Sequence, residues 1–423
     1  MPPCHAPTLG TDMYGGGEHI EHFEKHVANM FGKHAGMFSI TGSMAQLIAL
    51  KIHSTGRNAI FACHPKCHIL LHQERAFESL LSFSCLPIGS PSEVLSATSI
   101  ELGFGKHWKQ PSSLVIELPE RELGGQTISW KELEKIREYT QSKGIKLHLD
   151  GARIWEIQPY YKKSFQEIAS LFDSVYVSFY KGLQGSTGAM LLGSEEFIRD
   201  ARLWQHRFGG RIFHTFPLAI AAEKALNDQI STFQKRADKM REVVHAMTKA
   251  QEEFVQAKLK EEPPQRNVLE KIRAKERAAE QAQAKKKAAA ATAAAQAKTE
   301  EEGTASSPPA STAATSSSSS SPAVAAIPFQ PFFSFIPSIP QCSMAHMHLT
   351  VSPEVASPLR DSIAVTTGIK LFDGLRAGGK RACVFEWKMG THNACIDTQE
   401  YVRGWTEWMK QRYEQMQKEM MDQ

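Results

Sequence analysis

Two stretches decide the fold: IKLHLDGAR at Ile145–Arg153 and SVYVSFYKGLQGSTG at Ser174–Gly188. Each is a short, mostly apolar run that leads to one charged residue, Asp150 in the first and Lys181 in the second. Short apolar runs separated by helical segments are typical of buried parallel strands, and ligands bind at the carboxyl ends of such strands. We therefore expect Asp150 and Lys181 to meet at one site.

A lysine and an aspartate at one strand edge are the two groups that pyridoxal phosphate chemistry needs. The lysine amine forms a Schiff base with the cofactor, and the carboxylate keeps the pyridine nitrogen protonated so that the ring withdraws electrons. Neither residue is diagnostic alone, but the pair predicts this cofactor.

The length, charge and composition of the sequence argue against several other classes of protein. The 423 residues suffice for two domains, and a formal net charge of +4 gives no reason to expect a nucleic-acid partner. The sequence contains no run of about 18 apolar residues, so we predict no membrane span. The N-terminus lacks the apolar core of a secretory signal, and we therefore expect a cytoplasmic protein. Seven cysteines, an odd number, favour free thiols over a disulfide framework.

The stretch CHPKCH at Cys63–His68 invites a metal or haem interpretation. The common haem attachment sequence has two residues between its cysteines and this stretch has three, while a structural zinc site needs a second ligand pair that the sequence does not show. We therefore predict no metal site.

The composition divides the chain into three zones. Residues 1–248 alternate apolar runs with amphipathic stretches, as in a large α/β domain. Residues 249–331 form a charged and Ala/Ser-rich insertion, largely disordered, since 299–326 cannot bury enough apolar surface to offset the entropy of ordering. Residues 332–423 regain globular patterning, with strands expected at 344–351 and 381–389 and a helix at 397–418.

The first zone begins with a helical stripe at 19–31 and a strand at 36–40. Thr41-Gly42-Ser43 then opens a helix at 44–52. Backbone amides at such a helix start favour a phosphate group, although an ordinary N-cap has the same composition.

Five motifs, taken in order, resemble the threonine aldolase and β-eliminating lyase family of pyridoxal phosphate enzymes. They are TGSMAQ (41–46), HPKCHILLHQERAFE (64–78), ELPERELGG (117–125), HLDGAR (148–153) and SFYKGLQGSTGAMLLG (178–193). The resemblance implies an α/β protein of fold type I: a large domain with a mostly parallel seven-stranded sheet and a small α+β C-terminal domain. The insertion has no counterpart in the family.

The resemblance also assigns roles to residues. Lys181 is implied as the Schiff-base lysine, Asp150 as the partner of the ring nitrogen, and His68 as the histidine that stacks on the ring and lies near the scissile bond. Arg153 is implied to reach the cofactor's phenolic oxygen and the substrate carboxylate, though it could instead pair with Glu156. The implied cofactor site also includes Thr41, Gly42, Ser43 and Ser178.

Several positions depart from the family pattern. Glu120 replaces a second active-site histidine, and the family's N-terminal segment is expected to be missing ahead of Asp12. Lys388 falls near the small-domain arginine that binds the substrate carboxylate, with Arg381 a less direct candidate. Phe213 occupies another arginine position of the family, with Arg211 nearby. We therefore count Arg153, Glu120 and Lys388 as candidate substrate ligands.

The function expected from the resemblance is retro-aldol cleavage of a β-hydroxy amino acid to glycine and an aldehyde. Two alternatives remain: another pyridoxal phosphate reaction such as β-elimination, racemisation or transamination, and an impaired relative with an interaction role. Enzymes of this fold build their sites across a dimer interface, so a homodimer or homotetramer is expected. The segment Trp204–Phe213 is the candidate to reach a neighbouring site, or is a glycine-containing loop between helices.

Overall fold

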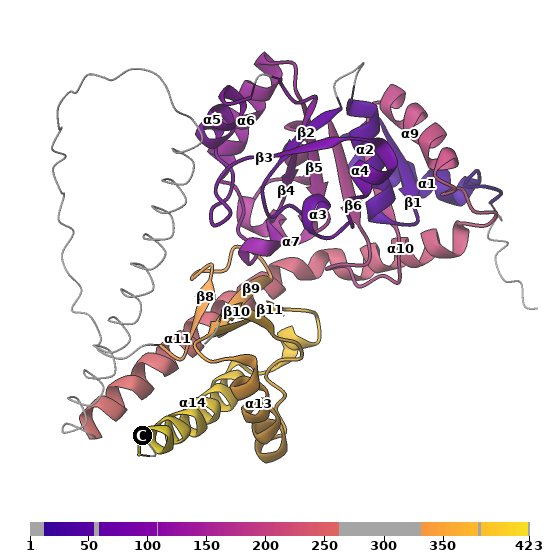
Figure 1. Ribbon diagram of the computed structural model, residues 1–423. Helices are drawn as coiled ribbons and strands as arrows, with labels where there is room; N and C mark the ends of the chain where they lie inside the picture. Colours follow the sequence, from indigo (N-terminus) through magenta and orange to yellow (C-terminus); the bar gives the residue numbers. More distant parts are fainter. Residues whose placement is uncertain (1–11, 55–58, 108, 262–330, 380–381, 422–423) are drawn as a thin grey trace, which may run out of the picture. The chain divides into compact units, whose positions relative to one another are not determined.

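The structure is a computed structural model that describes residues 12–54, 59–107, 109–261, 331–379 and 382–421. The described residues up to Thr248 and from Phe332 onward form one compact unit. This unit contains two sheets, of seven and four strands (Figure 1).

The larger sheet has the strand order β1-β7-β6-β5-β4-β2-β3. Only β7 runs antiparallel to its neighbours; the other six strands share one direction. The expected mostly parallel seven-stranded sheet is therefore confirmed. Its strands are β1 (Ala35–Ser39), β2 (Ile60–Cys63), β3 (Ser84–Pro87), β4 (Ser113–Glu117), β5 (Lys146–Gly151), β6 (Ser174–Ser178) and β7 (Ala189–Gly193).

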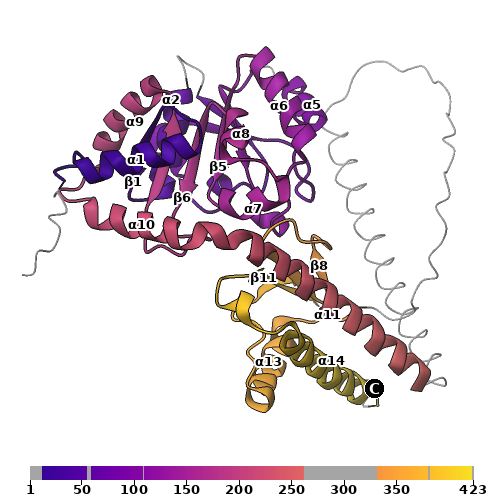
Figure 2. The same ribbon diagram turned by 180° about the vertical axis from the view of Figure 1, so that it is seen from behind.

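Helices cover both faces of this sheet (Figures 1 and 2). Leu147, Leu149, Val175 and Val177 point to one face and join the largest apolar core, because alternate residues of a strand face the same side. The helices on this face are α1 (Glu18–Met30), α5 (Ala97–Gly105), α6 (Trp130–Ser142), α7 (Ile154–Tyr161), α8 (Phe165–Ser170) and α10 (Phe216–Gln229).

The other face of the sheet is more polar at its centre, where β5 and β6 present His148, Asp150, Ser174 and Ser178. Two smaller apolar clusters flank these residues. The helices that contribute to them are α2 (Gly42–His53), α3 (His68–Leu71), α4 (Ala76–Leu81) and α9 (Glu195–Arg207). The expected helix at 19–31 and strand at 36–40 are confirmed as α1 and β1.

The smaller sheet is antiparallel, in the order β10-β11-β9-β8. An aromatic cluster fixes it to its helices: the ring of Trp405 lies 6.1 Å from those of Phe372 and Phe385 and 5.5 Å from that of Phe333. The expected strands and helix of this region are confirmed as β9, β11 and α14. Its elements are β8 (Phe333–Ile336), β9 (Met344–Leu349), α13 (Pro353–Thr367), β10 (Arg376–Gly379), β11 (Ala382–Lys388) and α14 (Thr398–Met421).

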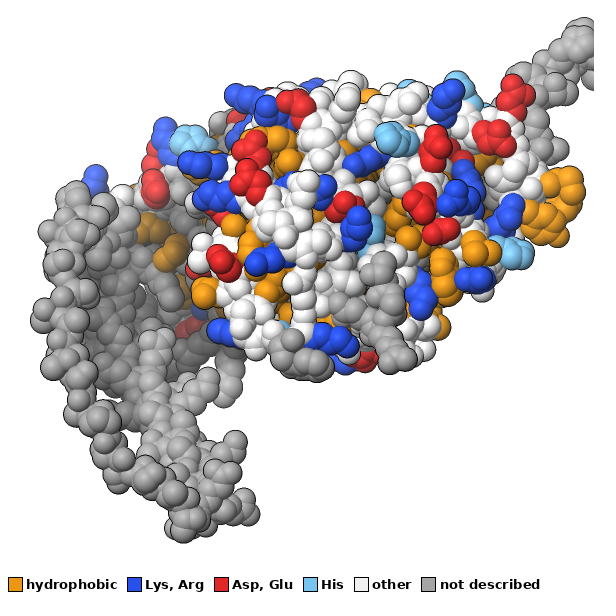
Figure 3. Space-filling model, turned by 90° about the horizontal axis from the view of Figure 1, so that it is seen from above, with side chains coloured by type: hydrophobic (Ala, Val, Ile, Leu, Met, Phe, Trp, Pro, Cys, Tyr) orange, Lys and Arg blue, Asp and Glu red, His pale blue; other side chains and the backbone are white. Residues whose placement is uncertain are grey.

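A second unit comprises Lys249–Pro331. Its described part continues α11 (Phe233–Glu261), and the segment 299–326, expected to be disordered, lies outside the described residues. None of the helices in the described ranges combines the length and hydropathy needed to cross a bilayer. Acidic and basic side chains are intermixed over the face drawn in Figure 3.

Candidate active site

The N-terminus of α2 is the first component of the site. Thr41 is its N-cap, with the side-chain oxygen accepting the amide of Met44 at 3.3 Å. At Gly42 a Cβ would overlap the hydroxyl of Tyr176, which comes from β6, so only glycine allows this close approach. The first-turn amides and the helix dipole make the N-terminus of a helix such as α2, 12 residues long, a favourable place for a phosphate group.

Asp150 and Lys181 come from neighbouring strands. Asp150 lies near the carboxyl end of β5 in register with Tyr176 of β6, and β6 ends at Ser178, three positions before Lys181. The charge of each group favours the ionised form of the other, although burial has the larger effect and lowers the pKa of Lys181 and raises that of Asp150. The structure therefore brings the two residues together at the same edge of the sheet.

Asp150 is held almost entirely away from solvent, with 2% of its surface exposed. Its Oδ1 accepts the amide of Ala152 at 3.1 Å, and its Oδ2 accepts the side-chain amide of Gln46. Burial raises the pKa of Asp150, whereas these hydrogen bonds and the charges of Arg153 and Lys181 lower it. A cation brought to this carboxylate would therefore stabilise its ionised form further.

Lys181 is partly buried, and its Nζ lies 5.0 Å from the centre of the Tyr180 ring. Burial and the nearby positive charges of Arg153 and Arg121 lower the pKa of Lys181. A lower pKa increases the fraction of free amine at neutral pH, and only the free amine reacts with an aldehyde. The lysine is therefore activated by its surroundings.

His68 begins the short helix α3, and its backbone amide donates to Oε2 of Glu117 at 3.1 Å. Its Nδ1 lies 3.3 Å from Nε2 of Gln73, so the tautomer of the ring depends on the orientation of that amide. Burial and nearby positive charges lower the pKa of His68 to about 4, which leaves the imidazole neutral at pH 7. The charged groups concerned are His72, Lys181, Arg121 and Arg153.

The cysteines around this histidine carry free thiols. Cys63 Sγ lies 3.3 Å from Cys85 Sγ, and burial contributes to raising the pKa of both Cys63 and Cys67. In the part of the chain that the structure describes, His, Cys, Asp and Glu side chains form no group of three or more able to hold a metal ion.

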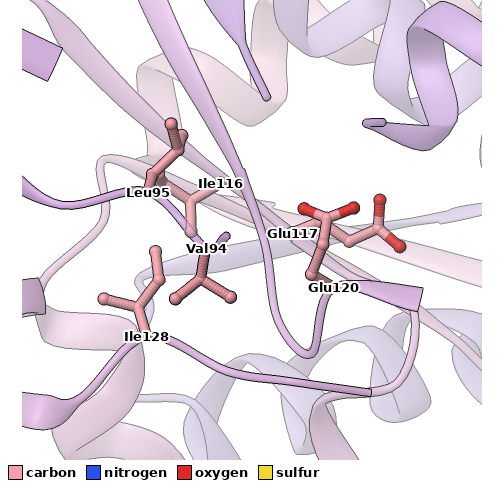
Figure 4. Close-up of a pocket in the computed structure, with 6 residues that line it drawn as sticks. All are labelled: Val94, Leu95, Ile116, Glu117, Glu120 and Ile128. Carbon is pink, nitrogen blue, oxygen red and sulfur yellow. The ribbon is translucent and has the colours of Figure 1, made fainter. Parts of the chain in front are cut away.

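Glu117 and Glu120 place two more carboxyl groups beside Asp150. Glu117 ends β4 in register with Asp150, and its oxygens accept the backbone amides of His68 and Arg121 at 3.1 and 3.2 Å. Burial, and next the charge of Asp150, raise the pKa of Glu117 to about 8; burial and Glu117 raise that of Glu120 well above its usual value. Figure 4 shows the two carboxyl groups side by side at a cavity of about 10 Å³.

Arg153 is also buried and has two carboxylates within reach. Its Nε lies 3.9 Å from Glu156 Oε1, and its Nη2 lies 3.8 Å from Glu386 Oε1. The pairing with Glu156 that the sequence left open is therefore present, at a distance longer than a hydrogen bond. Arg153 also lowers the pKa of Lys181 by its charge, which places it near the lysine.

Glu386, on β11 of the smaller sheet, is surrounded by cationic groups. Its closest ion pairs are with Lys388 Nζ at 2.6 Å and Arg121 Nε at 2.7 Å, and Arg376 Nη2 lies at 3.4 Å. Burial acts to raise the pKa of Glu386, but His346, Lys388 and Arg153 hold it well below the usual range. Glu386 therefore stays ionised and orients the arginines around it.

Several residues of this site were not predicted from the sequence. Glu117 could have been found, because β4 ends in a carboxylate just as β5 does. Gln46 lies one turn into α2 within the TGSMAQ motif, but its contact with Asp150 requires knowing how α2 packs. Arg121 and Glu386 are 265 positions apart, and no local pattern pairs them.

The other predicted positions lie as follows. Ser178 Oγ is buried and makes no hydrogen bond to a described residue. Arg211 Nε donates to the carbonyl of Tyr14 at 2.9 Å, and Phe213 packs edge-on against the Tyr14 ring. The segment Trp204–Phe213 includes the glycine-containing loop after α9. Arg381 lies outside the described residues.

The site suits pyridoxal phosphate. It combines an activated lysine, a buried aspartate, a helix N-terminus in which a Cβ at Gly42 has no room, and the unpartnered buried hydroxyl of Ser178. On a mostly parallel sheet of this topology, these groups define the fold type I class of pyridoxal-phosphate-dependent proteins.

Comparison with known proteins identifies the family. The model of the beta-eliminating lyase family matches residues 5–301, and the chain belongs to this family, whose members are pyridoxal phosphate dependent. A solved structure assigned as an L-allo-threonine aldolase from Listeria monocytogenes is similar, with a TM-score of 0.73 and 27% identity over 96% of this chain and 91% of that one.

Curated relatives match over a shorter span. Alanine racemase TOXG of Cochliobolus carbonum is 33% identical over 52% of this chain and 57% of that protein. Low-specificity L-threonine aldolase of Candida albicans is 28% identical over 54% of this chain and 62% of that protein. The matches span less than two thirds of the length of these relatives.

Proposed function

We propose that this protein is a pyridoxal-phosphate-dependent lyase that cleaves a β-hydroxy amino acid to glycine and an aldehyde. The observation that carries the proposal is the placement of Asp150 and Lys181 at the carboxyl ends of the adjacent parallel strands β5 and β6. The threonine aldolases among the similar proteins support this choice of reaction.

In this proposal the cofactor is held at both ends. Lys181 binds its aldehyde, and Asp150 holds the ring nitrogen. Arg153 reaches the phenolic oxygen. Thr41, Gly42 and Ser43 at the start of α2 would hold the phosphate group, and His68 and Ser178 would contact the ring.

Bound pyridoxal phosphate would supply an electron-withdrawing ring that stabilises negative charge at the α-carbon. The residues of the chain select which bond yields that charge. Arg121 and Arg153, oriented by Glu386, bind the substrate carboxylate, with Lys388 as an outer ligand. Neutral His68, or a water beside it, accepts the proton of the β-hydroxyl group, so that the bond between the α- and β-carbons breaks.

A second candidate function is amino acid racemisation. The resemblance to the family implies a histidine at the position of Glu120, and burial and Glu117 raise the pKa of this carboxyl group. A carboxyl group with a raised pKa is able to exchange a proton with a substrate carbon or hydroxyl. The relative named alanine racemase TOXG supports this alternative.

The test begins with the anchor of the cofactor. The purified protein with added pyridoxal phosphate is expected to show a visible absorbance band that Lys181→Ala loses, because an alanine cannot bind the aldehyde. Lys162→Ala, an exposed lysine with left-handed backbone after α7, serves as a control that keeps the band.

The reaction is then identified by its products. Incubation with L-threonine and L-allo-threonine is expected to release glycine and acetaldehyde, and L-alanine is expected to keep its configuration. Conversion of L- to D-alanine without aldehyde release would support racemisation instead. A wild-type protein that binds no cofactor would contradict both functions.

We further propose that the protein is a cytoplasmic homodimer or homotetramer in which Trp204–Phe213 reaches the neighbouring site. The likeness to fold type I enzymes and the free thiols of the described cysteines support this assignment. Sedimentation equilibrium is expected to give a mass of at least two chains, and a monomer at micromolar concentration would contradict the proposal.

A further inference from the structure

A continuous series of hydrogen bonds connects His53, at the end of α2, with Asp150 on β5. His53 Nε2 lies 2.6 Å from Ser174 Oγ, which lies 2.7 Å from His148 Nδ1. His148 Nε2 lies 3.2 Å from Gln46 Oε1, and the Gln46 amide donates to Asp150 Oδ2. All five residues are buried, with exposed fractions of 6% or less.

The position of each hydrogen in this series of hydrogen bonds follows from the contact between Gln46 and Asp150. The nitrogen of Gln46 donates to Asp150, so its oxygen must accept, and His148 Nε2 must therefore carry a hydrogen. In a neutral ring His148 Nδ1 is then an acceptor, and the hydroxyl of Ser174 donates to it. The Ser174 oxygen in turn accepts the Nε2 hydrogen of His53.

Neutral rings are consistent with the surroundings of both histidines. Burial, and next the charge of His53, lower the pKa of His148 to about 3, against a hydrogen bond to the Ser174 backbone that raises it; burial also lowers the pKa of His53 to about 4. The charged groups that act on His53 are Asp173 and Lys146, which oppose one another. Every donor in the chain consequently points towards Asp150, and hydrogen bonds aligned in one direction strengthen each other.

We propose that Gln46 and His148, backed by Ser174 and His53, are positioning residues that fix the orientation of Asp150 and favour its ionised form for the cofactor's ring nitrogen. The role of these residues towards the cofactor rests on the proposed function. The hydrogen bond from Gln46 opposes the effect of burial on the Asp150 carboxyl group, and no other described side chain hydrogen-bonds to Asp150.

These hydrogen bonds differ from those of an ordinary buried polar cluster because all of their donors are oriented towards Asp150. A buried polar cluster that served only stability would be satisfied by either tautomer of His148, provided that each polar atom found a partner. The proposed role requires hydrogen on Nε2 and none on Nδ1, because the opposite tautomer would turn Gln46 and point its carbonyl oxygen at Asp150.

The first experiment reads the tautomers directly, in protein without cofactor. Protein labelled with ¹⁵N at histidine is expected to show His148 and His53 as neutral rings with hydrogen on Nε2, unchanged from pH 5.5 to pH 8. Assignment uses His148→Phe and His53→Phe. Hydrogen on Nδ1 of His148 would overturn the proposal, whether or not the protein binds a cofactor.

The second experiment measures the effect on Asp150. Gln46→Leu is expected to weaken pyridoxal phosphate binding roughly 10- to 100-fold, the range that one hydrogen bond to a charged group supplies. Gln158→Leu is the control, because Gln158 is a half-buried glutamine of α7 that donates instead to the carbonyl of Lys163 at 2.8 Å. The control is expected to bind the cofactor within about twofold of wild type.

Ser174→Ala keeps the inference testable if Gln46→Leu does not fold. It removes the hydroxyl that donates to His148 Nδ1 and that is three hydrogen bonds away from Asp150. The change is expected to move the ¹⁵N signal of Nδ1 and to weaken cofactor binding roughly 3- to 10-fold. Wild-type affinity in both variants would overturn the inference. A wild-type protein without cofactor affinity would contradict the proposed function instead, and the tautomer measurement would still decide the hydrogen-bond chain.

Discussion

At the scale of residues, the carboxyl groups of Glu117, Glu120 and Asp150 share one buried edge of the sheet. Burial raises the pKa values of both glutamates, and the charge of Asp150 raises them further, because like charges in a buried place disfavour ionisation. Asp150 receives a hydrogen bond from the Gln46 side chain, and the charges of Arg153 and Lys181 act on it. Burial raises the pKa of all three carboxyl groups, but Asp150 has a hydrogen bond from Gln46 and the charges of Arg153 and Lys181 to favour its ionised form.

The raised pKa values of Glu117 and Glu120 make the stability of the protein depend on pH. A carboxyl group with a raised folded-state pKa stabilises the fold below its unfolded value of 4.5, and that contribution is lost as the pH rises through the folded value. The free energy of unfolding is expected to fall from pH 5 to pH 8 by up to about 1.4 kcal/mol per pH unit for each such group. Glu120→Gln is expected to flatten this slope in urea titrations.

Glu167→Gln provides the comparison of opposite sign. The Ser164 amide, Lys163 and the Ser164 hydroxyl lower the pKa of Glu167 to about 2, so its contribution is present above pH 4.5 and lost in acid. Its removal should therefore matter more at pH 7 than at pH 3. Parallel stability curves for wild type and Glu120→Gln would contradict the assigned protonation.

Arg121 supplies a second prediction at this scale. Its guanidinium is held by Glu386 and Glu122, and a lysine cannot reproduce the planar set of donors that binds a carboxylate with two hydrogen bonds. Arg121→Lys is expected to raise KM for the amino acid roughly 10-fold while kcat changes less than about threefold. Steady-state kinetics would contradict a substrate role if only kcat fell.

At the scale of elements, the sequence predicted those strands and helices whose local pattern agrees with their final place. The runs before Asp150 and Lys181 are apolar because β5 and β6 lie in the middle of a sheet covered on both faces. The strands β8 and β10 were not anticipated, since β8 is four residues with an alternating pattern and β10 is the short run Arg376–Gly379. Short edge strands carry too little pattern for recognition.

The start of α10 depends on a residue far away in the sequence. Thr215 precedes α10 but makes no side-chain cap, and Oδ1 of Asp12 accepts the amides of Thr215 and Phe216 at 2.7 and 2.8 Å. Asp12→Ala is expected to lower the free energy of unfolding by about 1–2 kcal/mol, measured by urea titration. Asp12→Asn keeps an acceptor oxygen and should lose less; equal losses would contradict the capping role.

At the scale of the whole molecule, the site combines groups from the two sheets, and this could not be read from the sequence. Lys388 was selected by its position near a family arginine, yet its Nζ pairs with Glu386. The hydrogen bond from Arg121 to Glu386 joins residues 265 positions apart, and only the packing of β11 near the end of β4 creates it. Contacts of this kind have no periodic signal.

The division of the chain also yields a prediction. We propose that 299–326 is an insertion without a part in the fold, because its Ala/Ser-rich composition offers little apolar surface to bury. Deletion of these residues is expected to leave the melting temperature within about 1 °C and the absorbance of the bound cofactor unchanged. A loss of several degrees in differential scanning calorimetry would contradict this division.

The antiparallel strand β7 has a consequence for biosynthesis. Within the described sheet β1 pairs with β7 alone. During synthesis Ala35–Ser39 therefore cannot pair until Ala189–Gly193 has been made. The four strands β2 to β5 pair with one another and can assemble during that interval. The helix that follows β1 is thus docked late, and a nascent chain stalled before β7 should have no completed recess for a coenzyme's phosphoryl group.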